Sequence, residues 1–372
     1  MSSVFWACVV LLAYTYAGYP LLMRLLACLR PLPEARSAQE PMVTVVLVVR
    51  DAAGLVRAKL DNLLQLDWPG DRLEIVVACD GCTDGTAEAC RAVGDPRVHV
   101  LESNARRGKA ACLNDAVAVA RGEVLLMVDV RQRVDPQALR TLVARLADPA
   151  VGAASGELCF EDPESGFACS VDAYWRYEKM LRLAESRSGS VVGVTGALYV
   201  LRRNLFEPLP EGTVLDDVLV PMRVAARGFR VVFEQRAIAW DRASPSPAQE
   251  RARKVRTLAG NFQLLQLAPW LLDPSANPLW FRFVSHKLLR LVAPWAILVL
   301  LAATCVLATR GTFYQACLWL ALAAGFLLLL ARVLPALSRS LPVRLLSAFL
   351  HMNLYSAEAA IAFARRDATR LW

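Results

Sequence analysis

Three stretches of this 372-residue chain lack charged side chains altogether: residues 4–23, 291–309 and 312–331. Each is close to the ~20 residues that an α-helix needs to cross a bilayer. The chain as a whole is 56% hydrophobic, with a mean hydropathy of +0.38. This composition excludes an ordinary soluble protein and predicts a multi-pass membrane protein.

The first uncharged stretch also lacks the basic leader and the short apolar core of a signal peptide, so we expect residues 1–30 to remain as a membrane anchor. Residues 1–23 contain no Lys or Arg. Basic residues follow this stretch and precede the second one: Arg24, Arg30, Arg36, Arg282, Lys287 and Arg290. Because positive charge stays on the cytoplasmic side, we expect an inner (cytoplasmic) membrane protein whose polar middle faces the cytoplasm.

A fourth apolar run, residues 345–364, contains His351, Asn353 and Glu358. The basic residues on its two sides both favour the cytoplasm, yet a complete crossing would separate them. These flanking residues are Arg332, Arg339, Arg344, Arg365, Arg366 and Arg370. Either this run lies partly in the interface or the charge rule fails here.

The sequence has little that indicates nucleic acid or zinc. The net charge is +8, but the basic residues gather beside the apolar stretches, where anionic lipids attract them. We therefore expect membrane lipids, and no nucleic acid, as partners. The ten cysteines are scattered, and Cys79-x-x-Cys82 has no second Cys or His pair at zinc spacing, so they read as reduced thiols.

Residues 42–240 alternate strand-like and helix-like patterns, which predicts an α/β domain. We expect strands at 43–49, 73–78, 98–101, 124–128, 191–201 and 229–235. Expected helices cover 55–64, 109–120, 171–185 and 247–267, and two more begin at Asp135-Pro136 and near Asp216. We predict that residues 130–134 are a connection and that the aromatic and basic segment 268–290 lies on the membrane surface.

Two aspartates stand where predicted parallel strands end. Asp80 follows the strand at 73–78, and Asp129 follows the strand at 124–128. Ligands of open parallel sheets bind at this edge. Two residues after Asp129, where many metal-dependent transferases have a second carboxylate, stands Arg131.

Five motifs occur in order along the chain: VVACDGCTDGT around Asp80, RRGKAACLND around Lys109, MVDVR around Asp129, LDDVLVPMRVAARGFRV around Asp217 and RKVRTLAGN around Arg256. Together with the leading anchor and trailing apolar stretches, they resemble the family-2 glycosyltransferases. The similarity covers about residues 40–300 and is nearest in layout to the membrane-embedded hyaluronan, cellulose and poly-N-acetylglucosamine synthases.

The resemblance implies a GT-A-like domain, with a Rossmann-related mixed sheet, that transfers a sugar with inversion from a nucleotide-diphospho-sugar, specifically a UDP-sugar. It implies that Asp80 and Lys109 bind the nucleotide side of the donor. It also implies that Asp129 meets the diphosphate and a divalent cation, Mg²⁺ or Mn²⁺, and that Arg256 faces the diphosphate. Asp217 matches the catalytic base, and a helix N-terminus would hold it anionic.

Several positions depart from the family pattern. Asp51-Ala52-Ala53 stands where the family often has Asn-Glu, and Arg131 replaces the second acid of D-x-D, which puts the metal in doubt. Asp216-Asp217 replaces the family's Glu-Asp. Further candidates for the acceptor or diphosphate site are Asp216, Arg131, Arg253 and Thr257. Thr257 stands where processive synthases have a tryptophan, which puts polymerisation in doubt.

We therefore expect an anchor at 1–30, a glycosyltransferase domain at 40–260, interfacial segments at 261–290 and a membrane region at 291–372. The expected acceptor is a polysaccharide or a lipid-linked glycan. Because three or four spans are few for a pore, we also expect a homo-oligomer or an export partner if the spans form a channel. The alternative is a degenerate, nucleotide-binding membrane scaffold of the same fold. Retention of Asp80, Asp129 and Asp217 argues against that alternative.

Overall fold

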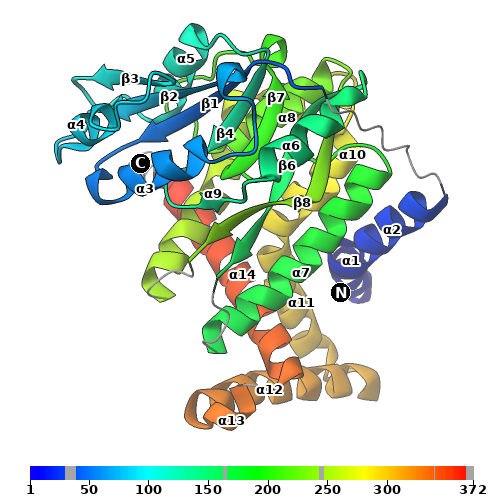
Figure 1. The fold of residues 1–372 in the computed structure, drawn as a ribbon. Helices are drawn as coiled ribbons and strands as arrows, with labels where there is room; N and C mark the ends of the chain where they lie inside the picture. Colours follow the sequence, from blue (N-terminus) through cyan, green and yellow to red (C-terminus); the bar gives the residue numbers. More distant parts are fainter. Residues whose placement is uncertain (30–38, 162–165, 243–246, 339, 366–372) are drawn as a thin grey trace.

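The computed structural model describes residues 1–29, 39–161, 166–242, 247–338 and 340–365. It shows an α/β domain from which a group of long helices projects (Figure 1). Several basic residues used in the topology argument lie outside the described residues: Arg30, Arg36, Arg339, Arg366 and Arg370.

One eight-stranded mixed sheet forms the centre of the domain, in the order β3-β2-β1-β4-β7-β6-β8-β5. Strands β3, β2, β1 and β4 run parallel to one another. Strand β7 is antiparallel to both of its neighbours, β4 and β6, whereas β6 and β8 are parallel. The strands are β1 (Val43–Val49), β2 (Leu73–Asp80), β3 (Val98–Ser103), β4 (Val124–Val128), β5 (Arg133–Val134), β6 (Val151–Phe160), β7 (Leu198–Arg202) and β8 (Arg230–Asp241).

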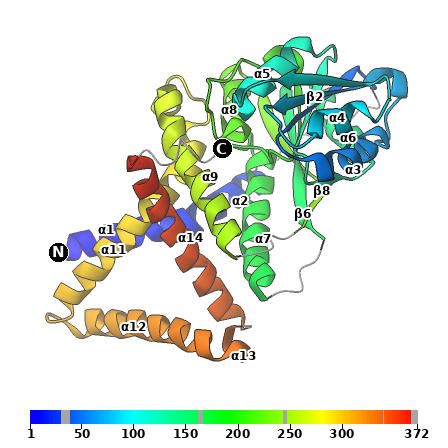
Figure 2. The same ribbon diagram turned by 90° about the vertical axis from the view of Figure 1, so that its left-hand side faces the viewer.

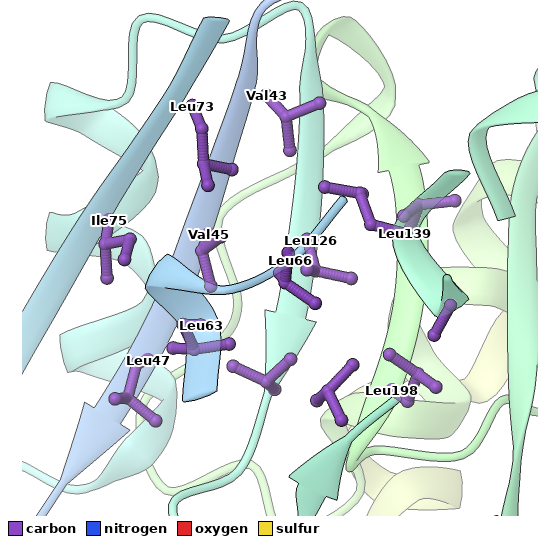
Figure 3. Close-up of a cluster of buried hydrophobic side chains, with 14 of the residues drawn as sticks. Val43, Val45, Leu47, Leu63, Leu66, Leu73, Ile75, Leu126, Leu139 and Leu198 are labelled. Carbon is purple, nitrogen blue, oxygen red and sulfur yellow. The ribbon is translucent and has the colours of Figure 1, made fainter. Parts of the chain in front are cut away.

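Helices cover both faces of the sheet, because successive strand residues point to opposite sides. Val43, Val45 and Leu47 of β1 pack with α3 (Ala53–Leu64), α4 (Thr86–Arg91) and α6 (Ala138–Val143) in the cluster of Figure 3. Val46 and Val48 pack on the other face with α5 (Lys109–Val119) and α8 (Asp216–Ala226). All of β1, β2 and β4 is buried, as the continuous apolar runs indicate.

The predicted α/β class is confirmed, while several element boundaries were wrong. The strand expected at 191–201 begins only at Leu198, and the helix expected from Asp135 begins at Ala138. The connection at 130–134 contains the short strand β5. Strand β6 was missed because its sequence, VGAASGELCF, is rich in small residues and lacks the β-branched signal.

Within the described ranges, three helices are long and apolar enough to cross a membrane: Ser2–Leu29, Trp280–Leu307 and Thr312–Val333. The first combines α1 (Ser2–Ala13), a π-helical turn and α2 (Tyr19–Leu29), and the second combines α10 (Trp280–Phe283), a second π-helical turn and α11 (Leu289–Leu307). α1 packs along α11. The last of the three is α12, which lies across the far end of α11 (Figures 1 and 2).

The uncertain fourth run forms α14 (Leu341–Ala364), which returns from the far end of the helices to the α/β domain (Figure 2). There it packs on α9 (Pro247–Leu267), with Arg251 donating to both carboxylate oxygens of Glu358 at 2.9 and 2.8 Å. Phe262 and Phe363 stack with ring centroids 5.6 Å apart. The C-terminal part of α14 therefore contacts the α/β domain, and the side of the membrane on which it lies stays a prediction.

Residues 268–290, expected on the membrane surface, contribute to the core of the domain as well. Leu271 and Phe283 are fully buried in the cluster that also holds α5 and α8. Phe281 on the same helix is 44% exposed. The segment therefore joins the α/β domain to the membrane helices, and its interfacial location stays a prediction.

Candidate active site

Asp80 ends β2 as predicted, but its carboxylate is fully buried. It accepts hydrogen bonds from the backbone N–H groups of Arg107 (2.6 Å) and Gly108 (3.1 and 3.0 Å). Gly81 beneath this turn has φ +59, and a Cβ there would lie 2.6 Å from the backbone nitrogen of Arg106. Asp80 thus fixes the turn from which Lys109 starts α5, and a contact with the nucleotide stays a prediction.

Lys109 joins two carboxylates from distant parts of the chain. Its Nζ lies 3.2 Å from Asp129 Oδ1, just after β4, and 3.1 Å from Asp216 Oδ2, in the first turn of α8. Burial opposes the charge on Lys109, but Asp129 and Asp216 outweigh it and raise the pKa of this lysine. Three predicted site residues therefore meet at one edge of the sheet.

The neighbouring acids Asp216 and Asp217 have different surroundings. Asp216 is 5% exposed and is paired with Lys109. Asp217 is half-buried, and its Oδ1 is buried without a hydrogen-bond partner among the described residues. Burial and the adjacent Asp216 raise the pKa of Asp217 to about 6, against the opposing effect of Lys109. An unpaired carboxylate with this pKa suits a general base near neutral pH.

Arg131 turns away from Asp129 toward an acid that sequence reasoning missed, Asp241 at the end of β8. The Arg131 Nη2 lies 3.5 Å from Asp241 Oδ2, which also accepts a hydrogen bond from Gln132 at 2.8 Å. The guanidinium of Arg253 on α9 lies 4.0 Å from the same oxygen. Asp241 is 3% exposed. It therefore connects the loop after β4 to the start of α9.

Lys59 of α3 holds the other side of that loop. Its Nζ donates to the carbonyl oxygen of Gln132 at 2.6 Å, and burial lowers the pKa of Lys59 to about 7 despite the nearby Asp129. One turn later, Asn62 exchanges two 2.8 Å hydrogen bonds with the backbone of Val134. The sequence did contain a feature that could have identified Lys59, because this lysine interrupts the apolar stripe of its predicted helix.

The two remaining predicted residues lie on α9. Arg256 is half-buried and forms no hydrogen bond or ion pair with any described residue. Thr257 is exposed, and its hydroxyl donates to the carbonyl oxygen of Arg253. A Cβ on Gly260, one turn after Arg256, would lie 2.7 Å from Leu215 Cγ, so this face of α9 packs against the start of α8.

A further residue that sequence reasoning missed, after Asp241 and Lys59, is Tyr199 on β7, which is 1% exposed. Its hydroxyl has no hydrogen-bond partner among the described residues. Burial and the charge of Asp216 raise its pKa well above the ordinary value, and Asp217 and Asp129 act in the same direction. An unpaired buried hydroxyl is costly, so it belongs to the polar centre of the site.

For a divalent cation, the described residues supply one carboxylate. Asp129 is 39% exposed and pairs with Lys109 through Oδ1 only. No group of three His, Cys, Asp or Glu within the described ranges comes together as a ligand set. Mg²⁺ is often held by one or two protein carboxylates plus substrate phosphates and waters. Asp129 therefore fits a cation that is bound together with a diphosphate.

Proteins of a known family have sequences similar to this one. A family model described as "Glycosyltransferase like family 2" matches residues 41–260, more than half of the chain. The chain is 23% identical over 249 residues to the probable glycosyltransferase YdaM of Bacillus subtilis, which covers 59% of this chain and 55% of YdaM. It is 24% identical over 354 residues to an N-acetylglucosaminyltransferase of Rhizobium sp. (strain N33), which covers 85% of this chain and 78% of that protein.

The fold is similar to that of the mannosyltransferase PcManGT from Pyrobaculum calidifontis, solved in complex with GDP-Man and Mn²⁺. The TM-score is 0.76 at 27% identity, and the match covers 97% of this chain and 99% of PcManGT. The chain spans only about half the length of YdaM. The chain belongs to glycosyltransferase family 2, with a GT-A-like domain and, in the part of the chain that the structure describes, three helices able to span a membrane.

Proposed function

We propose that the protein is an inverting glycosyltransferase of the inner membrane that uses Asp217 as its general base. The observation that carries this proposal is the contrast between the two acids at the start of α8. Asp216 is neutralised by Lys109, while Asp217 keeps a buried, unpartnered oxygen and a pKa of about 6.

The acceptor hydroxyl oxygen attacks the anomeric carbon of the donor sugar from the face opposite the diphosphate. As this C–O bond forms, Asp217 takes the hydroxyl proton, and the bond from the anomeric carbon to the diphosphate oxygen breaks. The electron pair leaves with the nucleoside diphosphate, and the configuration is inverted. A positioned base of this kind contributes about 10²–10⁴-fold.

Cations on the donor side stabilise the diphosphate that leaves. Lys109 and the unpartnered Arg256 supply positive charge from α5 and α9, where pre-placed charge acts without reorganisation. Asp129 would hold a divalent cation, which when bound neutralises phosphate oxygens. Arg131 stays with Asp241 and keeps the loop after β4 in place.

The donor is a nucleotide-diphospho-sugar, with GDP-Man in PcManGT as support for this class. The uridine base expected from the sequence stays a prediction. The acceptor is a glycan or a lipid-linked molecule that reaches Asp217 beside the membrane helices. Homo-oligomerisation and an export partner also stay predictions.

The test is nucleoside diphosphate release from a panel of UDP- and GDP-sugars by protein reconstituted in lipid, with Mg²⁺ or Mn²⁺. We expect release from one donor by the wild type and loss in Asp217→Asn, while Asp71→Asn, in a 3₁₀ turn before β2, serves as the matched control. Release from no donor would instead favour the degenerate scaffold. The size of the product then distinguishes one transfer from polymerisation.

A further inference from the structure

The side of Asp217 that faces the membrane helices carries two cations, Arg182 and Lys287, together with the buried acid Glu178, which lies 3.7 Å from Arg182. Arg182 of α7 (Gly166–Arg187) and Lys287 both act to lower the pKa of Asp217, against the larger effects of burial and Asp216. Arg182 donates to the hydroxyl oxygen of Thr195 at 2.9 Å. Lys287 belongs to the candidate span Trp280–Leu307. A membrane helix thus brings positive charge to the base.

The loop between these cations and Asp217 contains two glycines that leave space. A Cβ added to Gly196 would lie 3.6 Å from Asp217 Oδ2. A Cβ added to Gly193 would lie 3.5 Å from the Asp217 carbonyl oxygen and 3.8 Å from Lys287 Nζ. Gly193 is therefore close to the backbone of Asp217 and to Lys287, and neither glycine adds a side chain in this space.

Lys287 differs from the other basic residues of its helix. Arg282 donates to the carbonyl oxygens of Glu185, Ser188 and Ser190, and Arg290 is paired with Glu178 at 2.8 Å. Lys287 is half-buried and forms no hydrogen bond or ion pair with any residue that the structure describes, although the charges of Glu178 and Asp217 act on it from a distance. An ammonium group in this position is stabilised by an anion.

The donor side of the site already has its own cations. Lys109 lies between Asp129 and Asp216, which places it on the β4 side of the acid pair. Lys287 approaches through Gly193, from the membrane side. The two lysines are therefore placed to serve different anions, one on the donor and one on the acceptor.

We propose that the acceptor is an amphiphile that carries a phosphate group, and that Lys287, with Arg182, binds this phosphate while the acceptor hydroxyl reaches Asp217. This proposal rests on the proposed function and specifies its acceptor class. The apolar part of the acceptor lies along the membrane helices, because Lys287 is located near the domain end of a candidate span.

The test compares acceptors in wild-type protein held in phosphatidylcholine nanodiscs, with the donor identified by nucleotide release. Competing probes are dodecyl phosphate, its neutral counterpart dodecanol, and the soluble glycerol-1-phosphate. We expect dodecyl phosphate to inhibit sugar transfer competitively against the lipid acceptor, and dodecanol and glycerol-1-phosphate to inhibit at least tenfold more weakly. Equal inhibition by glycerol-1-phosphate would contradict an amphiphilic source of the phosphate, and equal inhibition by dodecanol would overturn the phosphate site.

Variants of Lys287 give the second readout. We expect Lys287→Gln to weaken inhibition by dodecyl phosphate about 10–100-fold and to raise the acceptor KM similarly, with the donor KM within about twofold. Lys287→Arg keeps the charge and restores most of the affinity. Arg310→Gln, in the exposed loop between α11 and α12, is the matched control. A Lys287→Gln variant that changes the donor KM instead would overturn the proposal.

Failure of this inference differs from failure of the proposed function. If the acceptor has no phosphate, the wild type still releases nucleotide from its donor, and Lys287→Gln leaves the acceptor KM unchanged. If the protein is not a transferase, no donor is turned over by any variant.

Discussion

The two sides of the acid pair at the start of α8 are built differently. On the donor side, the acids that end β2 and follow β4 are paired within the protein: Asp80 with the turn at Arg107–Gly108, and Asp129, like Asp216, with Lys109. On the membrane side, Asp217 Oδ1 accepts no hydrogen bond and the Lys287 ammonium forms no hydrogen bond or ion pair, among the described residues. The paired side is organised before any ligand binds, whereas the other side is completed by one.

The largest expected effect comes from Asp217→Asn, which removes the unpaired acid but keeps its shape. We expect kcat to fall about 10²–10⁴-fold with little change in donor KM. The raised pKa means that the folded state disfavours ionised Asp217, and this penalty is present above pH 6 and fades between about pH 6 and 4. The variant should therefore melt no lower than the wild type at pH 7. A lower melting temperature would show that Asp217 is structural.

On the paired side, Lys109→Met should affect stability as well as activity. It leaves Asp129 and Asp216 without their shared cation, which costs on the order of 3 kcal/mol because the Lys109–Asp216 pair is largely buried. We expect a lower melting temperature and a higher donor KM. Lys109→Arg should retain part of the stability and part of the donor affinity. Lys179→Met, which breaks the more exposed pair with Glu157, should lower the melting temperature less. An unchanged melting temperature would show that the donor side is not pre-organised.

The metal requirement tests whether Asp129 is sufficient as the single protein carboxylate that holds a divalent cation. We expect EDTA to remove activity and Mn²⁺ to restore it. Arg131→Asp adds a second carboxylate to the loop after β4, so the Mn²⁺ concentration for half-maximal activity should fall roughly tenfold, because ligand charge sets cation affinity. Activity that persists in EDTA would show that Lys109 and Arg256 compensate the diphosphate without a metal.

The pH profile of the wild type tests whether Asp217 differs from its paired neighbour Asp216. Burial and Asp216 raise the pKa of Asp217 to about 6, and a base must be unprotonated to accept a proton. The value of kcat/KM should therefore fall tenfold per pH unit below about pH 6 and be flat from pH 7 to 8. An acidic limb near pH 4 would mean that Asp217 is no more desolvated than an ordinary surface carboxylate.

The smallest effect is expected where α14 meets α9, away from the site. Arg251 and Glu358 form a bidentate pair, but their side chains are 59% and 37% exposed. Exposed pairs contribute little to stability. Arg251→Ala should leave the melting temperature and the activity unchanged, measured alongside Lys109→Met. A marked loss of activity would show that α14 helps to position Arg256 on α9.

Part of the site could be predicted because it follows local patterns. Asp80 and Asp129 follow continuous apolar runs, and parallel strands bring their ends to one edge. Strand β6 could not be predicted from its sequence, because its small residues form a strand only when neighbouring strands pair with them, as β7 and β8 do. Asp241 and Tyr199 are isolated polar residues in strands, and no spacing connects them to the motifs.

The sequence by itself determined the α/β class, the three apolar helices and the order of the motifs, because these depend on periodicity and on residues close in the chain. Only the tertiary structure decided the charge state of the centre. Lys109 meets acids 20 and 107 positions away, and Lys287 reaches the base from a membrane helix. Burial and the adjacent Asp216 raise the pKa of Asp217 against the opposing charges of Lys109, Lys287 and Arg182, and the burial and these cations come from segments distant in the sequence.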